Sequence, residues 1–231
     1  EIPIYPRKIV RTKWFDQCYA TNEELGAICS DEETAFQLWA PTATSVFLRL
    51  NDQLYKMMRA EKGVWKKTIK GDWHGAIYEY IVTVNGEKHT VIDPYAKGSL
   101  ANTNKGVVIN FSRTEKLNSK RPAITSLQDA IIYEIHVRDA TIGVESGVKN
   151  RGKFLGLHEK NTKTKNGFSS GLEYLKELGI THVELLPIND FARVDELNPD
   201  HDYNWGYDPL LYQVPEGSYS LRPNDPLSRI N

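Results

Sequence analysis

The sequence has 231 residues, of which 40% are hydrophobic and 10% aromatic, a length and composition typical of one large or two ordinary globular domains and not of extended disorder. Its 29 basic and 30 acidic residues give a net charge of −1, so a neutral polar ligand fits better than nucleic acid or an anionic membrane. No apolar run approaches the roughly 20 residues that cross a bilayer, and the first residues lack a signal-peptide pattern, which predicts a cytoplasmic protein without a membrane partner.

The two cysteines, Cys18 and Cys29, are too few for a disulfide scaffold and lack the spacing of a zinc site. Thiols in a reducing compartment are the favoured interpretation, and one disulfide between them is the alternative. The sequence predicts no metal and no cofactor.

Residues 1–13 are predicted to be an N-terminal segment, and residues 14–111 an all-β sandwich. Phe36 and Leu38 alternate with polar neighbours, as the apolar residues of 46–50 do, so each run has one apolar face at period two. Asn85-Gly86 separates two β-rich runs, which is a strong hairpin signal. Trp65 and Trp73 are interpreted as buried or packed against hairpins, and a sugar-binding platform is the alternative.

Residues 112–128 are polar and are predicted to be a linker, after which the pattern changes. Residues 131–137 form a nearly continuous apolar run, typical of a strand covered on both faces. Ser170 begins a capping-box pattern, a helical stripe of leucines follows over 172–178, and Gly179 is a natural stop. A second strand at 182–186 completes a strand–helix–strand unit with parallel strands.

Ligands of parallel α/β folds gather where the strands end. The long loop after Leu186 contains Tyr203-Asn204-Trp205-Gly206-Tyr207-Asp208-Pro209, and aromatic faces beside amide and carboxylate groups suit a carbohydrate. Packing of these aromatics onto the fold is the alternative, equally weighted on the residues alone.

Other polar residues near the two strands are weaker candidates. Glu134 and Glu184 on neighbouring strands could form a carboxylate pair with one raised pKa, but such carboxylates more often anchor loops. His136 with Asp139, or His182 with Glu184, could suggest a metal, although two ligands are weak evidence. Histidines that are hydrogen-bonded within the core are favoured instead.

The segment 203–209 resembles the signature of the type I pullulanases, which belong to the α-amylase superfamily. Residues 133–139 resemble the first barrel strand of that family, 179–187 its helix end and second strand, and 38–43 its N-terminal carbohydrate-binding-type sandwich. The resemblance implies a multidomain protein. It implies an immunoglobulin-like sandwich that would be followed, at residues 129–231, by the first β-α-β part of a (β/α)₈ TIM barrel.

The resemblance also implies retaining hydrolysis of α-1,6-glucosidic linkages in pullulan, amylopectin or glycogen. Tyr207 would stack on the glucose beside the scissile bond, and Asn204, Trp205 and Asp208 would shape that subsite or hold Tyr207; Tyr203 is the fifth candidate. None of the family's catalytic carboxylate motifs is present, so we predict no catalytic residue within the chain.

The same reasoning predicts that the remainder of the enzyme is a partner of this chain, and that residues 129–231 are poorly stable by themselves, because two strands cannot close a barrel. Two alternatives remain. One is a non-catalytic α-glucan-binding protein, and the other is a related isoamylase or branching enzyme.

Overall fold

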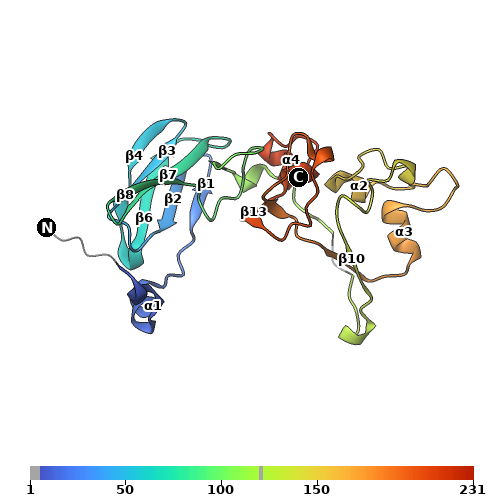
Figure 1. Ribbon diagram of the computed structural model, residues 1–231, viewed down its shortest axis with the longest axis horizontal. Helices are drawn as coiled ribbons and strands as arrows, with labels where there is room; N and C mark the ends of the chain where they lie inside the picture. Colours follow the sequence, from blue (N-terminus) through green and yellow to red (C-terminus); the bar gives the residue numbers. More distant parts are fainter. Residues whose placement is uncertain (1–5, 120–121) are drawn as a thin grey trace. The chain divides into compact units, whose positions relative to one another are not determined.

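A computed structural model describes residues 6–119 and 122–231, and its contacts divide the chain into two compact units. The first unit extends to Thr114 and the second runs from Glu115 to Asn231. Figure 1 colours the first from blue to green and the second from green to red. The division falls within the predicted linker, 112–128. Residues 120–121 of that linker and residues 1–5 of the predicted N-terminal segment lie outside the described residues.

A short helix, not a strand, occupies the predicted start of the sandwich. α1 (Lys13–Tyr19) follows the 3-10 turn η1 (Lys8–Arg11). Thr12 caps α1 by accepting a hydrogen bond from the backbone N–H of Phe15 at 3.2 Å, and such a cap satisfies one of the free N–H groups of a first turn. The first strand begins only at Gly26, so residues 13–19 differ from the β-rich pattern expected there.

Two antiparallel sheets form the body of the first unit (Figure 1). One has the strand order β1-β2-β6-β5, and the other has the order β4-β3-β7-β8 with β9 also paired to β7. These sheets confirm the predicted all-β, sandwich-like fold. The elements are β1 (Gly26–Cys29), β2 (Glu33–Trp39), β3 (Ser45–Leu50), β4 (Gln53–Lys56), β5 (Met58–Arg59), η2 (Glu61–Gly63), β6 (Val64–Lys70), β7 (Ile77–Val84), β8 (Glu87–Val91), β9 (Gly106–Val107) and η3 (Phe111–Arg113).

The core of the sandwich follows the period-two pattern of the sequence. Phe36 and Leu38 on β2 are 0% and 6% exposed, and the apolar residues of β3 are buried on every second position. The predicted hairpin is also confirmed, because Asn85 and Gly86 join β7 to β8 with φ angles of 55° and 83°. Positive φ at both positions is what the tight turn of a twisted hairpin requires.

A carboxylate lies in the interior of the sandwich. Asp93 is 0% exposed and accepts hydrogen bonds from the Tyr78 hydroxyl at 2.8 Å, the Tyr95 backbone N–H at 2.8 Å and the Tyr80 hydroxyl at 3.4 Å. Burial raises the pKa of Asp93 to about 6, although these hydrogen bonds favour its charged form. The first unit therefore contains a group that changes charge near neutral pH.

The second unit contains the predicted strand–helix–strand arrangement. β10 (Ile132–Ile135) pairs in parallel with β11 (His182–Leu185), with Ile132 opposite His182, and α3 (Gly171–Glu177) lies between them in sequence. Gly179 follows α3 with a φ of 68°, which fits the predicted helix stop. The two strands and the helix thus form where the sequence predicted them.

Among the described residues β10 pairs only with β11, so its faces stay partly open: Ile132 is 60% and Tyr133 40% exposed. One detail of this region, the capping box, was predicted wrongly. Ser170 precedes α3 but its hydroxyl oxygen accepts no capping hydrogen bond; the hydroxyl donates to the backbone oxygen of Ser146 at 2.5 Å.

The remainder of the second unit is built from short elements around a small apolar cluster. Val137, Phe191 and Tyr219 are its buried members.

Cys18 and Cys29 of the first unit are free thiols. Across residues 6–119 and 122–231, no helix combines the length and apolar character needed to span a bilayer. The other elements are η4 (Leu127–Asp129), η5 (Val144–Ser146), α2 (Phe154–His158), β12 (Asn189–Phe191), η6 (Pro199–His201), β13 (Pro209–Pro215), η7 (Gly217–Tyr219) and α4 (Pro226–Ile230).

Candidate functional site

The aromatic loop, residues 203–209, lies beyond the second parallel strand. β12 and β13 pair antiparallel, so the chain between Ala192 and Asp208 is the connection of a hairpin. The sequence predicted a long irregular loop here and did not predict this pairing, because the run from Asn189 to Phe191 is short and lacks an alternating pattern. The hairpin gives the aromatic loop a fixed base.

Two polar residues of the aromatic loop hold its shape from within. The Asn204 amide nitrogen donates to the backbone oxygen of Ala192 at 2.7 Å and to a carboxylate oxygen of Asp208 at 2.8 Å, while its amide oxygen accepts from the Gly206 N–H at 2.9 Å. Arg193 Nε donates to the other Asp208 oxygen at 2.7 Å. Asn204 and Asp208 therefore brace the loop with their side chains.

These contacts keep Asp208 ionised. Desolvation acts to raise its pKa, but the hydrogen bonds from Asn204 and Arg193 outweigh it and lower the pKa below the usual value of 3.8. The ionised carboxylate is already bonded to two partners, so Asp208 is suited to holding the loop and not to transferring a proton.

Gly206 allows the loop to press against the end of β11. Its φ is 89°, and a Cβ atom there would lie 2.7 Å from the backbone oxygen of Pro187 and 3.0 Å from the Pro187 Cβ. Both the backbone conformation and the contact exclude a side chain. The residues on either side, Trp205 and Tyr207, consequently project from a tight turn.

The aromatic side chains of the loop are open to solvent. Tyr203 is 53%, Trp205 58% and Tyr207 66% exposed. Tyr203 also donates to a carboxylate oxygen of Asp139 at 2.5 Å, a hydrogen bond that raises the pKa of the tyrosine. The loop therefore offers aromatic faces, while its Asn204 and Asp208 side chains already have hydrogen-bond partners.

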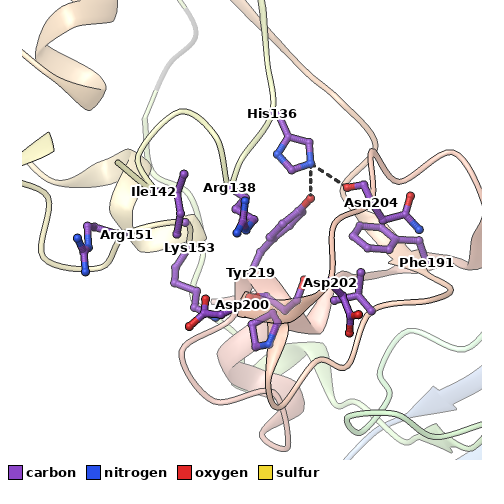
Figure 2. Close-up of a pocket in the computed structure, with 14 residues that line it drawn as sticks. His136, Arg138, Ile142, Arg151, Lys153, Phe191, Asp200, Asp202, Asn204 and Tyr219 are labelled. Atoms are coloured by element: carbon purple, nitrogen blue, oxygen red, sulfur yellow. Dashed lines mark hydrogen bonds between the residues drawn. The ribbon is translucent and has the colours of Figure 1, made fainter. Parts of the chain in front are cut away.

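A small pocket lies beside Asn204 of the aromatic loop (Figure 2). His136 and Tyr219 line its wall with Asn204, and Lys153 donates to the backbone oxygen of Ser218 at 2.6 Å. The cavity volume is about 30 Å³, which is room for one or two water molecules and not for a sugar ring. A carbohydrate bound by the loop would therefore contact its exposed aromatic side chains and would not enter this pocket.

The other acidic candidates lie elsewhere. Glu134 and Glu184 are directly opposite each other on β10 and β11, but both are exposed. The acid/base pair considered from the sequence would require burial of one of the two carboxyl groups. His136 is hydrogen-bonded within the fold, as the favoured interpretation predicted. Among the described residues, no group of three or more histidine, cysteine or acidic side chains could hold a metal ion.

The sequence analysis missed a buried ionic cluster. Arg229 of α4 donates to Glu196 with two nitrogens at 2.9 Å and lies 3.3 Å from Asp190, and its side chain is 0% exposed. Burial, with Glu196 and Glu216 nearby, raises the pKa of Asp190 to about 7. The sequence could not predict this cluster, because its charged residues are far apart along the chain and each is of a type that usually lies on the surface.

Of the two tryptophans weighed as a platform on the sandwich, one is excluded. Trp65 is 5% exposed and its indole N–H donates to the backbone oxygen of Ala40 at 3.0 Å. Trp73 is half-buried and donates to the backbone oxygen of Lys70 at 3.0 Å. The favoured interpretation of packed indoles is confirmed for Trp65.

Known proteins resemble both units. The model of carbohydrate-binding module 48, the isoamylase N-terminal domain, matches residues 24–96. Pullulanase of Bacillus subtilis (strain 168) is 45% identical over 96% of this chain and 31% of its own length, and chloroplastic pullulanase 1 of Arabidopsis thaliana is 30% identical over 91% of this chain and 27% of its own.

Solved structures agree with these matches. Pullulanase from Anoxybacillus sp. LM18-11, crystallised with maltotriose, has a TM-score of 0.92 and 45% identity over 96% of this chain and 33% of that one. Pullulanase type I of Bacillus subtilis str. 168, crystallised with maltose, has a TM-score of 0.89 and 46% identity, covering 96% of this chain and 32% of that one. The chain spans about a third of the length of these relatives. It is therefore homologous over nearly all of its length to the type I pullulanases.

Proposed function

We propose that this chain is part of a debranching glycoside hydrolase that cleaves α-1,6-glucosidic linkages in pullulan and branched α-glucans. One observation carries the proposal: Trp205 and Tyr207 expose aromatic faces on a loop whose Asn204 and Asp208 side chains are hydrogen-bonded to each other and to the loop. Aromatic rings stack on the C–H faces of sugar rings. The relatives crystallised with maltose and maltotriose support an α-glucan as the ligand.

In this proposal Tyr207 stacks on the glucose next to the scissile bond, with Tyr203 and Trp205 beside it, while Asn204 and Asp208 hold the loop. A retaining mechanism needs a nucleophile and an acid/base about 5 Å apart, and neither is assigned to residues of this chain. We also propose that β10, α3 and β11 are the first strand–helix–strand part of a (β/α)₈ barrel, with residues 14–111 as the sandwich module and 112–128 as the linker.

The test compares the complete protein with this chain alone on pullulan. The complete protein should release maltotriose, and residues 1–231 alone should release none. Tyr207→Ala should lower kcat/KM about fivefold or more, because it removes a stacked ring worth on the order of 1 kcal/mol or more. Tyr207→Phe keeps the ring and should retain most activity. Equal losses in the two variants would contradict stacking.

A non-catalytic α-glucan-binding protein is the second candidate. It predicts that the complete protein binds maltotriose, with weaker binding in Tyr207→Ala, but releases no sugar from pullulan. An isoamylase or branching enzyme is distinguished by its products, because neither would release maltotriose as the main product of pullulan.

A further inference from the structure

We propose that His136 is a positioning residue, which fastens the aromatic loop to the end of β10 and so sets the place of Tyr207. The inference rests on the proposed function of that loop. His136 lies just beyond β10, is 5% exposed, and is separated from the loop by more than sixty residues of sequence.

The hydrogen bonds of His136 assign its proton. Nδ1 accepts from the backbone N–H of Asp139 at 3.3 Å, so in the neutral ring the hydrogen is on Nε2. Nε2 lies 3.1 Å from the backbone oxygen of Asn204 and 3.0 Å from the Tyr219 hydroxyl (Figure 2). Since a carbonyl oxygen only accepts, His136 is the donor to the loop.

Asn204 is the residue through which this bond reaches Tyr207. Its backbone is held by His136, and its side chain braces Gly206 and Asp208, the two neighbours of Tyr207. Without the donor at Nε2, the brace keeps its internal bonds but loses its attachment to β10. The loop would then move as a whole, with its local shape kept.

Aromatic packing keeps the imidazole in this orientation. The Tyr219 ring meets His136 edge to face at 5.8 Å and 90°, and Phe154 and Phe191 pack against Tyr219 at 5.4 and 5.8 Å. A second attachment runs in parallel, because Tyr203 donates to Asp139, three residues after His136. The end of β10 therefore holds both of the first two residues of the aromatic loop.

The consequence for the proposed reaction is positional. A displacement on the order of 1 Å in a group that orients a substrate can cost about a hundredfold in rate. Contacts with distant parts of a polymeric substrate are not touched by His136, so KM should change much less than kcat.

Two substitutions separate the two ring nitrogens. In His136→Gln the side-chain amide N–H can take the place of Nε2, whereas in His136→Asn the shorter amide can replace only Nδ1. In the complete enzyme on pullulan, His136→Asn should lower kcat by about a hundredfold, with KM within about threefold of wild type, and His136→Gln should restore most of kcat. His201→Asn is the matched control, because His201 is exposed on the same connection and should leave kcat unchanged.

Amide hydrogen exchange of the peptide covering residues 203–209 tests the same inference without catalysis. Exchange should be about tenfold faster in His136→Asn, as expected for loss of a hydrogen bond of roughly 1.4 kcal/mol, and near wild type in His136→Gln. If the complete protein hydrolyses no substrate and the two variants still show this exchange pattern, only the proposed function is refuted. Unchanged exchange and kcat in both variants, or equal losses in both with a lower melting temperature, overturns the role of His136.

Discussion

The buried carboxylate of the sandwich should make its stability depend on pH. The folded-state pKa of Asp93 is about 6, above the ordinary value of 3.8, so the folded state binds this proton more tightly. Its contribution to stability is fully present below pH 3.8 and is lost as the pH rises through 6. The rise in pKa corresponds to roughly 3 kcal/mol, of which about 2 kcal/mol is lost between pH 4 and 7.

Asp93→Asn removes the ionisation and keeps an oxygen for the Tyr95 N–H. The free energy of unfolding of the variant, minus that of wild type, should therefore rise by about 2 kcal/mol from pH 4 to pH 7. Urea unfolding at several pH values measures this difference, and the amide exchange of peptides from β7 reports the unfolding of the sandwich.

In the control variant, Asp72→Asn, the stability difference from wild type should change with pH in the opposite direction. Arg113 lowers the pKa of the exposed Asp72 below 3.8, so the same difference for Asp72→Asn should fall as the pH rises toward 3.8 and change little above about pH 5. A difference for Asp93→Asn that stays flat or decreases between pH 4 and 7 would refute the reasoning.

Two further predictions concern the cores of the two units. Trp65→Ala should lower the free energy of unfolding in urea by about 3–5 kcal/mol, because Trp65 is 5% exposed. The control Trp14→Ala, at a residue 55% exposed, should stay within about 0.5 kcal/mol of wild type. Similar losses in the two variants would contradict the role of burial. Arg229→Met leaves Asp190 and its neighbouring carboxylate buried without their cation, which should cost the second unit about 3–5 kcal/mol at pH 8. Because the pKa of Asp190 is about 7 even with the arginine present, the loss in melting temperature should be smaller at pH 5, and a loss independent of pH would contradict the ionic origin.

The features that the sequence predicted are those that neighbouring residues determine. The alternation around Val46 fixes which face of β3 is buried, and Asn85-Gly86 fixes its turn by backbone conformation alone. The parallel pairing of β10 and β11 followed from the strand–helix–strand order. Each of these depends on a stretch of fewer than about sixty residues.

What could not be predicted depends on side chains that meet across the fold. Ser170 has the sequence of a cap, but its hydroxyl donates to the backbone oxygen of Ser146 and accepts no hydrogen bond from the first turn of α3. Arg229 and Glu196 resemble surface residues until α4 and the hairpin connection bring them together. The candidate site followed the same rule, because the aromatic loop was visible in the sequence while its attachment through His136 was not.

The close approach of Gly206 to Pro187 has a consequence for reading related sequences. A paralogue could retain every tyrosine and tryptophan of the segment and still be unable to present them, if any larger residue replaced this glycine and pushed the turn away from the end of β11. Identity at position 206 is thus a better criterion than aromatic content for sorting homologues that keep a working sugar contact from those that have drifted to another use.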